Sequence, residues 1–188
     1  IGGIHLLYGV NPDIAVFAKG ISNGFPMGAI IGKKEIMDVA QKSFISSTYW
    51  TERIGPVAAL ATIKKMQACN VPDHLINIGN KVRKIWDNAA NRLNLKIKIQ
   101  GIPPLSILSF EYPNKQAIIT LFTQEMLKKG FLASKAFYAT YAHKDEHIEK
   151  YSKAVEEVFK IISNAIENND VEIKLNRPIA HTEFRRLA

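Results

Sequence analysis

The chain has 188 residues, and 47% of them are hydrophobic, enough for one sizeable core or two small ones. This composition excludes an intrinsically disordered tail. The formal net charge of +8 would suit a polyanion, but the lysines are spread along the chain, often beside Glu or Asp, and no dense basic block contains interleaved aromatic residues. We therefore expect no specific nucleic-acid partner.

The chain has a single cysteine, Cys69, which excludes an internal disulfide framework and a cysteine-based zinc site. None of the five histidines has a spacing that requires a metal. No stretch approaches the roughly 20 apolar residues that cross a bilayer, and no signal-peptide pattern is present. We expect a soluble cytoplasmic protein without metal or membrane. Because the chain begins without Met, in an apolar stretch typical of a domain interior, we also expect it to be part of a larger protein.

The first third of the chain predicts two strands and two helices. Continuous apolar runs at 14–17 and 27–31, bounded by Gly or Pro, are typical of short buried strands. Helical spacing follows over 33–42. A break rich in Ser and Thr then precedes a helix that has Pro56 in its first turn and continues toward Met66.

A second boundary is predicted at Val71-Pro72-Asp73, where Asp73 is a suitable N-cap. A long amphipathic helix follows, and its apolar face consists of Leu75, Ile78, Val82, Ile85, Trp86, Ala89 and Leu93. The strict alternation of LKIKIQ, residues 95–100, then predicts a half-exposed strand.

The C-terminal part predicts two further strands and two helices. IPPLSILSFEY, residues 102–112, supplies a turn and a strand, and residues 115–129 form a helix ended by Gly130. FLAS, residues 131–134, is a candidate short strand, and a final helix starts near Asp145. The apolar stripe of that helix consists of Ile148, Tyr151, Val155, Val158, Phe159, Ile162 and Ile166. The change of pattern near Leu93 predicts α/β material before it and a smaller α+β unit after it.

Lys19 lies just past the first predicted strand, within PDIAVFAKGISNGFPMGAIIG, and Gly20, Gly24 and Gly28 allow backbone to approach a ligand there. Burial of an amine in an apolar site disfavours its charged form and makes it a nucleophile. Such a lysine forms Schiff bases with carbonyl compounds or transfers protons. A solvated lysine that caps a strand is the more common arrangement, and spacing alone does not choose between the two.

The segment GVNPDIAVFAKGISNGFPMGAIIGKKEIMD resembles the cofactor-lysine segment of the class III pyridoxal-phosphate-dependent aminotransferases. It is most similar to the branch that contains glutamate-1-semialdehyde 2,1-aminomutase. In that family a Pro-Asp-hydrophobic run leads to the Schiff-base lysine, then to a glycine-containing loop, Pro and a Gly-Ala strand. The resemblance implies that Lys19 is the catalytic residue, which holds pyridoxal 5′-phosphate as an internal aldimine and then moves a proton between two carbons of the substrate adduct.

A second segment, SSTYWTERIGPVAALATI, resembles the family segment in which a threonine donates to the cofactor phosphate across the dimer interface. The resemblance implies that Thr48 binds the cofactor. A hydroxyl and backbone N–H groups near a helix start suit an anion. On composition alone, Ser46, Ser47 and Thr48 also fit an ordinary loop.

Near the C-terminus, YATYAHKDEHIEKY and the tail HTEFRRLA resemble the closing segments of the same family. The residues of these two segments do not by themselves define a catalytic site. We expect His143 to be a turn or packing histidine and His147 to lie on a solvated helix face.

The resemblance covers essentially the whole chain but only about half of the family's fold. It implies the C-terminal part of a fold-type I transferase, with residues 1–92 as the end of the cofactor-binding large α/β domain and residues 93–188 as the small α+β domain. The acidic partner of the pyridine nitrogen, the stacking aromatic and the main phosphate loop are expected upstream of Lys19, on a missing N-terminal portion.

The implied function is that of an aminotransferase or aminomutase, a homodimer with shared active sites that acts on amino and keto or aldehyde substrates. The isolated chain is expected to be incomplete and inactive. The alternative is a non-catalytic interaction module that retains the aminotransferase fold.

Overall fold

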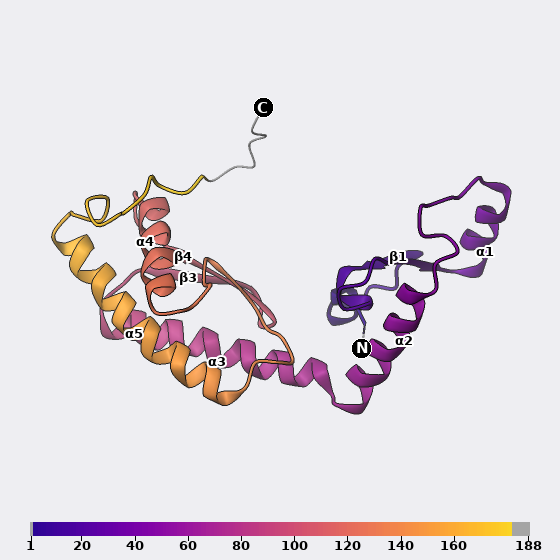
Figure 1. Ribbon diagram of the computed structural model, residues 1–188, viewed down its shortest axis with the longest axis horizontal. Helices are drawn as coiled ribbons and strands as arrows, with labels where there is room; N and C mark the ends of the chain where they lie inside the picture. Colours follow the sequence, from indigo (N-terminus) through magenta and orange to yellow (C-terminus); the bar gives the residue numbers. More distant parts are fainter. Residues whose placement is uncertain (1, 182–188) are drawn as a thin grey trace. The chain divides into compact units, whose positions relative to one another are not determined.

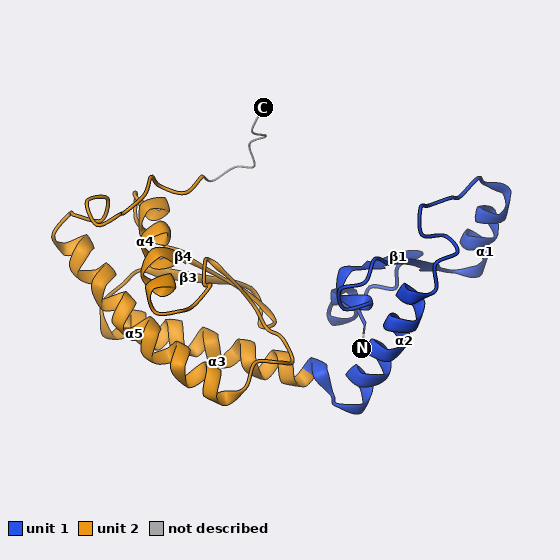
Figure 2. Cartoon of the chain, in the orientation of Figure 1, with its two compact units in different colours: residues 1–72 blue, residues 73–188 orange. Residues whose placement is uncertain are grey.

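The computed structural model describes residues 2–181 (Figure 1). The tail HTEFRRLA therefore lies, except for its first residue, outside the described residues. The chain divides into two compact units, Ile1–Pro72 and Asp73–Ala188 (Figure 2).

The first unit is built around a β-hairpin and one long helix. Its elements are η1 (Ile4–Tyr8), β1 (Ile14–Ala18), η2 (Lys19–Ile21), β2 (Gly28–Gly32), α1 (Lys34–Met37), η3 (Asp38–Lys42) and α2 (Ile54–Ala68). Strands β1 and β2 pair antiparallel, from Ile14 opposite Gly32 to Ala18 opposite Gly28. Both predicted strands and the helix at α2 are confirmed, while the helix predicted over 33–42 is divided into α1 and a 3-10 turn.

The prediction that these two strands are buried is wrong for this chain. Val16 is 69% exposed and Ile30 is 59% exposed. A two-stranded hairpin covers neither of its own faces, so its apolar residues are buried only where other layers lie against them. The apolar runs show that the strands suit a buried sheet, but the described residues of this unit do not enclose them.

The second unit contains a three-stranded antiparallel sheet and three helices. Its elements are α3 (Val71–Arg92, which begins two residues before the unit), β3 (Ile97–Ile102), β4 (Leu105–Phe110), α4 (Lys115–Lys128), β5 (Ala136–Tyr138) and α5 (Asp145–Glu167). The strand order is β3-β4-β5. Lys96 and Lys98 are exposed while Leu95 is buried, so the prediction of a half-exposed strand is confirmed.

The core of the second unit is formed by the sheet and all three helices. Phe110, Phe122 and Phe159 meet with ring centroids 5.6 to 6.4 Å apart. Trp86 donates from Nε1 to the Tyr151 hydroxyl at 2.9 Å, and burial raises the pKa of Tyr151. The buried residues of α3 are Val71, Ile78, Gly79, Val82, Trp86, Ala89 and Ala90. From Ile78 onward they belong to the core of the second unit, and the compact units divide within the first turn of this helix, between Pro72 and Asp73, not after it. The domain boundary between residues 92 and 93 concerns the complete enzyme and stays a prediction.

Two boundaries differ from the sequence-based expectation. Helix α3 begins at Val71, so Asp73 lies inside the first turn, where a carboxylate still suits the helix dipole and Pro72 is tolerated. Strand β5 is Ala136–Tyr138 and not residues 131–134. Several short apolar runs follow α4, and only the pairing of Ala136 to Tyr138 with the edge of β4 decides which run is the strand.

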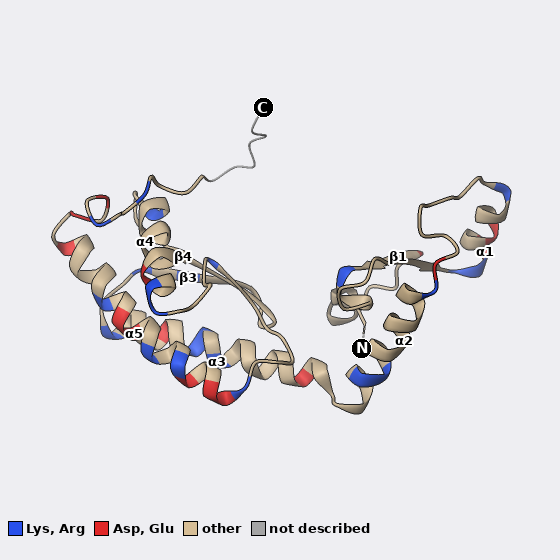
Figure 3. Cartoon of the chain, in the orientation of Figure 1, with Lys and Arg blue, Asp and Glu red and all other residues tan. Residues whose placement is uncertain are grey.

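Charged residues are distributed over both units, and many of them lie on α3 and α5 (Figure 3). Lys81 pairs with Asp145 at 2.5 Å and Arg92 pairs with Glu156 at 2.5 Å, joining α3 to α5. Exposed pairs of this kind each contribute about 0 to 1 kcal/mol. Among residues 2–181, no helix is both long and apolar enough to cross a membrane.

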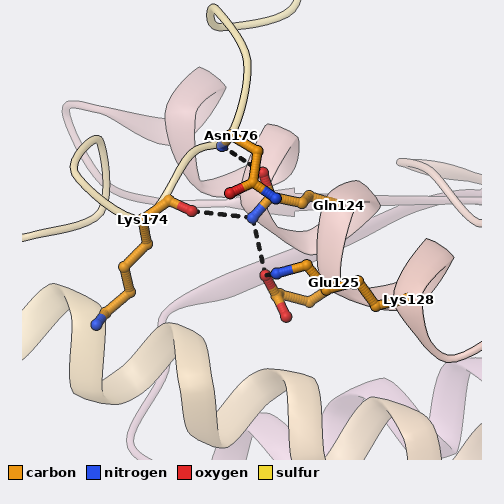
Figure 4. Close-up of polar contacts among 5 residues, drawn as sticks. All are labelled: Gln124, Glu125, Lys128, Lys174 and Asn176. Carbon is orange, nitrogen blue, oxygen red and sulfur yellow. Dashed lines mark hydrogen bonds and ion pairs between the residues drawn. The ribbon is translucent and has the colours of Figure 1, made fainter.

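The segment after α5 is attached to α4 by a side-chain amide (Figure 4). Gln124 donates from Nε2 to the carbonyl of Lys174 at 2.9 Å and accepts at Oε1 from the backbone N–H of Asn176 at 2.7 Å. Its Nε2 also donates to Glu125, which is paired with Lys128 at 2.6 Å. Gln124 thus supplies hydrogen-bond partners to the backbone of a segment of turns and bends that pairs with no strand.

Candidate active site

Lys19 occupies a special backbone position at the end of β1. It is the first residue of η2 and has φ +55, in the left-handed region. The other described non-glycine residues with positive φ are all asparagines, namely Asn23, Asn70, Asn94 and Asn169. Asparagine tolerates this region, whereas another L-residue pays about 1 to 2 kcal/mol for it. The backbone at Lys19 is therefore held in place by the surrounding loop.

The side chain of Lys19 is exposed, so of the two arrangements left open by the spacing the isolated chain shows the solvated one. Over the described part of the sequence, no hydrogen bond or ion pair involves the Lys19 amine. The physical reason is the same as for the hairpin, because the described residues of this unit do not enclose the side chain. What the chain itself supplies is an accessible, unpaired amine at a fixed position.

The loop from Lys19 to Met27 is restrained at both ends and in the middle. Ala18 and Gly28 pair across the hairpin at its base. Ser22 is buried, and its hydroxyl donates to the carbonyl of Phe25. Gly24 has φ +109, a conformation that glycine adopts without a side-chain clash.

Gly55 brings this loop against the first turn of α2. A Cβ added at Gly55 would lie 2.8 Å from the carbonyl oxygen of Pro26 and 3.1 Å from the Cβ of Met27. Only glycine permits this approach. The structure therefore places the Lys19 loop beside the helix that directly follows the Thr48 segment, which the sequence alone did not predict.

Thr48 lies in a series of turns before α2, and its side chain is exposed. In the portion that the structure describes, its hydroxyl has no hydrogen-bond partner, so it is free to donate to a ligand. Its assignment as a cofactor-binding residue stays a prediction.

The first turn of α2 is already occupied by an anion of the chain itself. Glu52 accepts from the backbone N–H of Ile54 at 2.8 Å and from that of Gly55 at 3.0 Å. These hydrogen bonds, that from Ile54 first, lower the pKa of Glu52. Pro56 has no N–H, and the N–H of Val57 donates to a carbonyl one turn back, at 3.1 Å.

The expected anion site at this helix start is therefore not supplied by backbone amides. The exposed hydroxyl of Thr48 and the exposed, unpaired amine of Lys19 are both accessible to a ligand. Sequence reasoning missed the role of Glu52, because the usual capping signals are Ser, Thr, Asp or Asn at the N-cap and acidic residues inside the first turn, and Glu52 precedes the N-cap Arg53.

Two of the histidines of the second unit lie as predicted, His143 in the turn before α5 and His147 exposed on the first turn of that helix. His143 accepts at Nδ1 from the backbone N–H of Thr140 at 3.0 Å, and His147 accepts at Nδ1 from that of Lys144 at 3.0 Å. Burial lowers the pKa of His143, and the nearby His147 and His74 add to this. Both histidines line an open cavity of about 630 Å³, which contains neither Lys19 nor Thr48.

Comparison with known proteins identifies the family to which the chain belongs. Residues 4–162 match the family model described as "Aminotransferase class-III". The chain is 28% identical over 163 residues to 3-aminobutyryl-CoA aminotransferase of Cloacimonas acidaminovorans, covering 84% of the chain and 39% of that protein. It is 28% identical over 185 residues to glutamate-1-semialdehyde 2,1-aminomutase of Ignicoccus hospitalis, covering 87% of the chain and 42% of that protein.

The fold agrees with this match. The structure of FumI from Sphingopyxis sp. MTA144, described as the internal aldimine form with pyridoxal phosphate, superposes with a TM-score of 0.80 at 20% identity, covering 87% of this chain and 40% of FumI. The architecture is thus that of part of a fold-type I pyridoxal-phosphate-dependent transferase. The chain belongs to the class III aminotransferase family. It spans about 40% of the length of the relatives that it matches.

Proposed function

We propose that the complete protein is a pyridoxal-phosphate-dependent aminotransferase or aminomutase similar to glutamate-1-semialdehyde aminomutase, and that Lys19 is its catalytic residue. The observation that supports this most directly is the position of Lys19 within the family match. It directly follows β1, has a left-handed backbone and lies in a loop restrained at both ends.

The chemistry divides between the cofactor and the chain. When bound, pyridoxal 5′-phosphate supplies an electron sink that stabilises negative charge at the substrate carbon. Lys19 holds the cofactor covalently through its amine and, once released, moves a proton between substrate carbons as a general base and acid. The Thr48 hydroxyl donates to the phosphate. In the reaction, an amino group is taken from one substrate and transferred to a keto or aldehyde carbon.

The exposed apolar residues of the first unit indicate which partners the chain has. The first unit exposes large apolar residues that suit a covered interior, including Val16, Ile30 and Trp50. We infer that an N-terminal portion of the same protein covers them, and that two copies form a cytoplasmic homodimer with shared active sites. The chain alone is incomplete and inactive under this proposal.

Covalent labelling tests the assignment of Lys19. The full-length protein is loaded with pyridoxal 5′-phosphate, reduced with borohydride, digested and mapped. The label is expected on Lys19 and lost in Lys19→Ala, whereas Lys34→Ala, which removes another exposed lysine of the same unit, keeps it. A label on a different lysine would sink the assignment.

The alternative is a non-catalytic interaction module that retains the fold. The exposure of Lys19 and the occupation of the α2 first turn by Glu52 favour it for the isolated chain. Loading the full-length protein with pyridoxal 5′-phosphate separates the two hypotheses. An absorbance band near the visible edge that Lys19→Ala abolishes indicates a formed site, and no band indicates a non-catalytic module.

A further inference from the structure

We propose that Ser22 is a positioning residue for Lys19, holding the loop in the conformation that presents the lysine amine. This inference rests on the proposed function. Ser22 lies three residues after Lys19 and is only 1% exposed. It is the one buried polar side chain of the first unit among the described residues, the other two being serines of the second unit.

The Ser22 hydroxyl closes the loop on itself. Its Oγ donates to the carbonyl of Phe25, and the backbone N–H of Phe25 donates back to the carbonyl of Ser22 at 3.4 Å. A buried hydroxyl without a partner is costly, so this bond selects the closed loop over conformations that would leave the hydroxyl unpaired. A carbonyl of the loop main chain is the acceptor, which means that the bond restrains the backbone and not merely a side chain.

The closed loop is connected directly to the unusual backbone of Lys19. Residues Lys19–Ile21 form the 3-10 turn η2, and the N–H of Ser22 donates to the carbonyl of Gly20 as the turn ends. Beyond Phe25, the carbonyl of Pro26 rests against Gly55 of α2. Ser22 therefore lies between Lys19 and the point where the loop is fixed to a helix.

Loss of the hydrogen bond from the Ser22 hydroxyl frees the loop backbone that keeps Lys19 in its left-handed conformation. The left-handed conformation at Lys19 is unfavourable in itself, so a freed loop returns this residue toward an ordinary backbone region and redirects its Cβ. A misplacement of about 1 Å of a reacting group reduces rates by up to roughly a hundredfold.

The test measures how fast Lys19 combines with pyridoxal 5′-phosphate in the full-length protein. In this step the amine nitrogen forms a C=N bond with the aldehyde carbon and the aldehyde oxygen leaves as water, so no oxidant or reductant is needed. The rate is followed by absorbance well below the melting temperature of each variant, and borohydride mapping confirms the lysine. We expect Ser22→Ala to slow adduct formation about tenfold. A near-isosteric Ser22→Cys, whose thiol is a weak donor, is expected to slow it less.

A matched control separates positioning from stability. Ser43 also donates its hydroxyl to a backbone carbonyl, that of Val39 at 3.4 Å, but it is exposed and lies outside the loop. Ser43→Ala is expected to keep the wild-type rate.

The outcomes are distinguishable. If Ser22→Ala lowers the melting temperature but keeps the wild-type rate, the bond is only structural and the proposal is overturned. If Ser22→Ala does not fold, Ser22→Cys carries the same comparison, and a wild-type rate in it overturns the proposal. If the wild-type protein forms no adduct at Lys19, the proposed function fails first, and the role of Ser22 fails with it.

Discussion

Replacement of Gly79 by alanine tests the packing of the second unit, because the helix and the tertiary structure predict effects of opposite sign. Gly79 lies in α3 and is buried. Glycine inside a helix costs about 1 kcal/mol relative to alanine, so helix propensity alone predicts that Gly79→Ala stabilises the protein.

The structure predicts the reverse. A Cβ at Gly79 would lie 1.8 Å from the carbonyl oxygen of Pro103 and 2.3 Å from its carbonyl carbon. Both atoms belong to the backbone of the turn between β3 and β4, so no side-chain rotation relieves the clash. Overpacking costs about 1 to 3 kcal/mol, and a contact this short belongs at the upper end. After the gain in propensity, we expect a net loss of about 2 kcal/mol in the free energy of unfolding.

Urea unfolding of the full chain, followed by the fluorescence of the buried Trp86 in a Trp50→Phe background, measures this difference. Asn80→Ala is the matched control, since Asn80 is the next residue of the helix and is exposed. It is expected to gain up to about 0.5 kcal/mol. A Gly79→Ala variant as stable as the parent protein would refute the reasoning, because it would show that Pro103 does not approach α3 so closely.

Two further predictions concern the same unit. Burial lowers the pKa of His143 in the folded state, so the unfolded state binds a proton more readily than the folded state does. The free energy of unfolding is therefore highest above about pH 6.5 and decreases as the pH falls below this value. The urea midpoint should be lower at pH 5.5 than at pH 7.5, and His143→Gln should reduce that difference; an unchanged difference would contradict the role of His143. Trp86→Phe leaves the buried hydroxyl of Tyr151 without its donor and should cost about 1 to 3 kcal/mol on urea unfolding. A double-mutant cycle with Tyr151→Phe should show coupling, and strictly additive effects would argue against the hydrogen bond.

Much of the local structure follows from sequence pattern. The long helices α3 and α5 have apolar stripes at helical spacing, and each stripe faces the core of the second unit. Lys19 directly follows β1, as the apolar run before it predicted. The likeness to the class III aminotransferases was also available from short segments, because the lysine motif carries its glycines and proline at fixed spacing.

The features that a pattern could not supply depend on residues distant in the sequence. Strand β5 is defined by the edge of β4, and the need for glycine at position 79 is set by Pro103. The exposure of β1 and β2 depends on which layers cover the hairpin, and no local pattern contains that information.

The sequence by itself determined the family and the type of most elements and singled out Lys19 as the candidate catalytic residue, because hydrophobic period and motif spacing are local properties. Only the tertiary structure decided that Lys19 has a left-handed backbone, that Glu52 fills the first turn of α2 and that Ser22 is buried within the loop. Each of these depends on which backbone N–H and C=O groups come into contact in the folded chain. A local sequence pattern does not show which residues make such contacts.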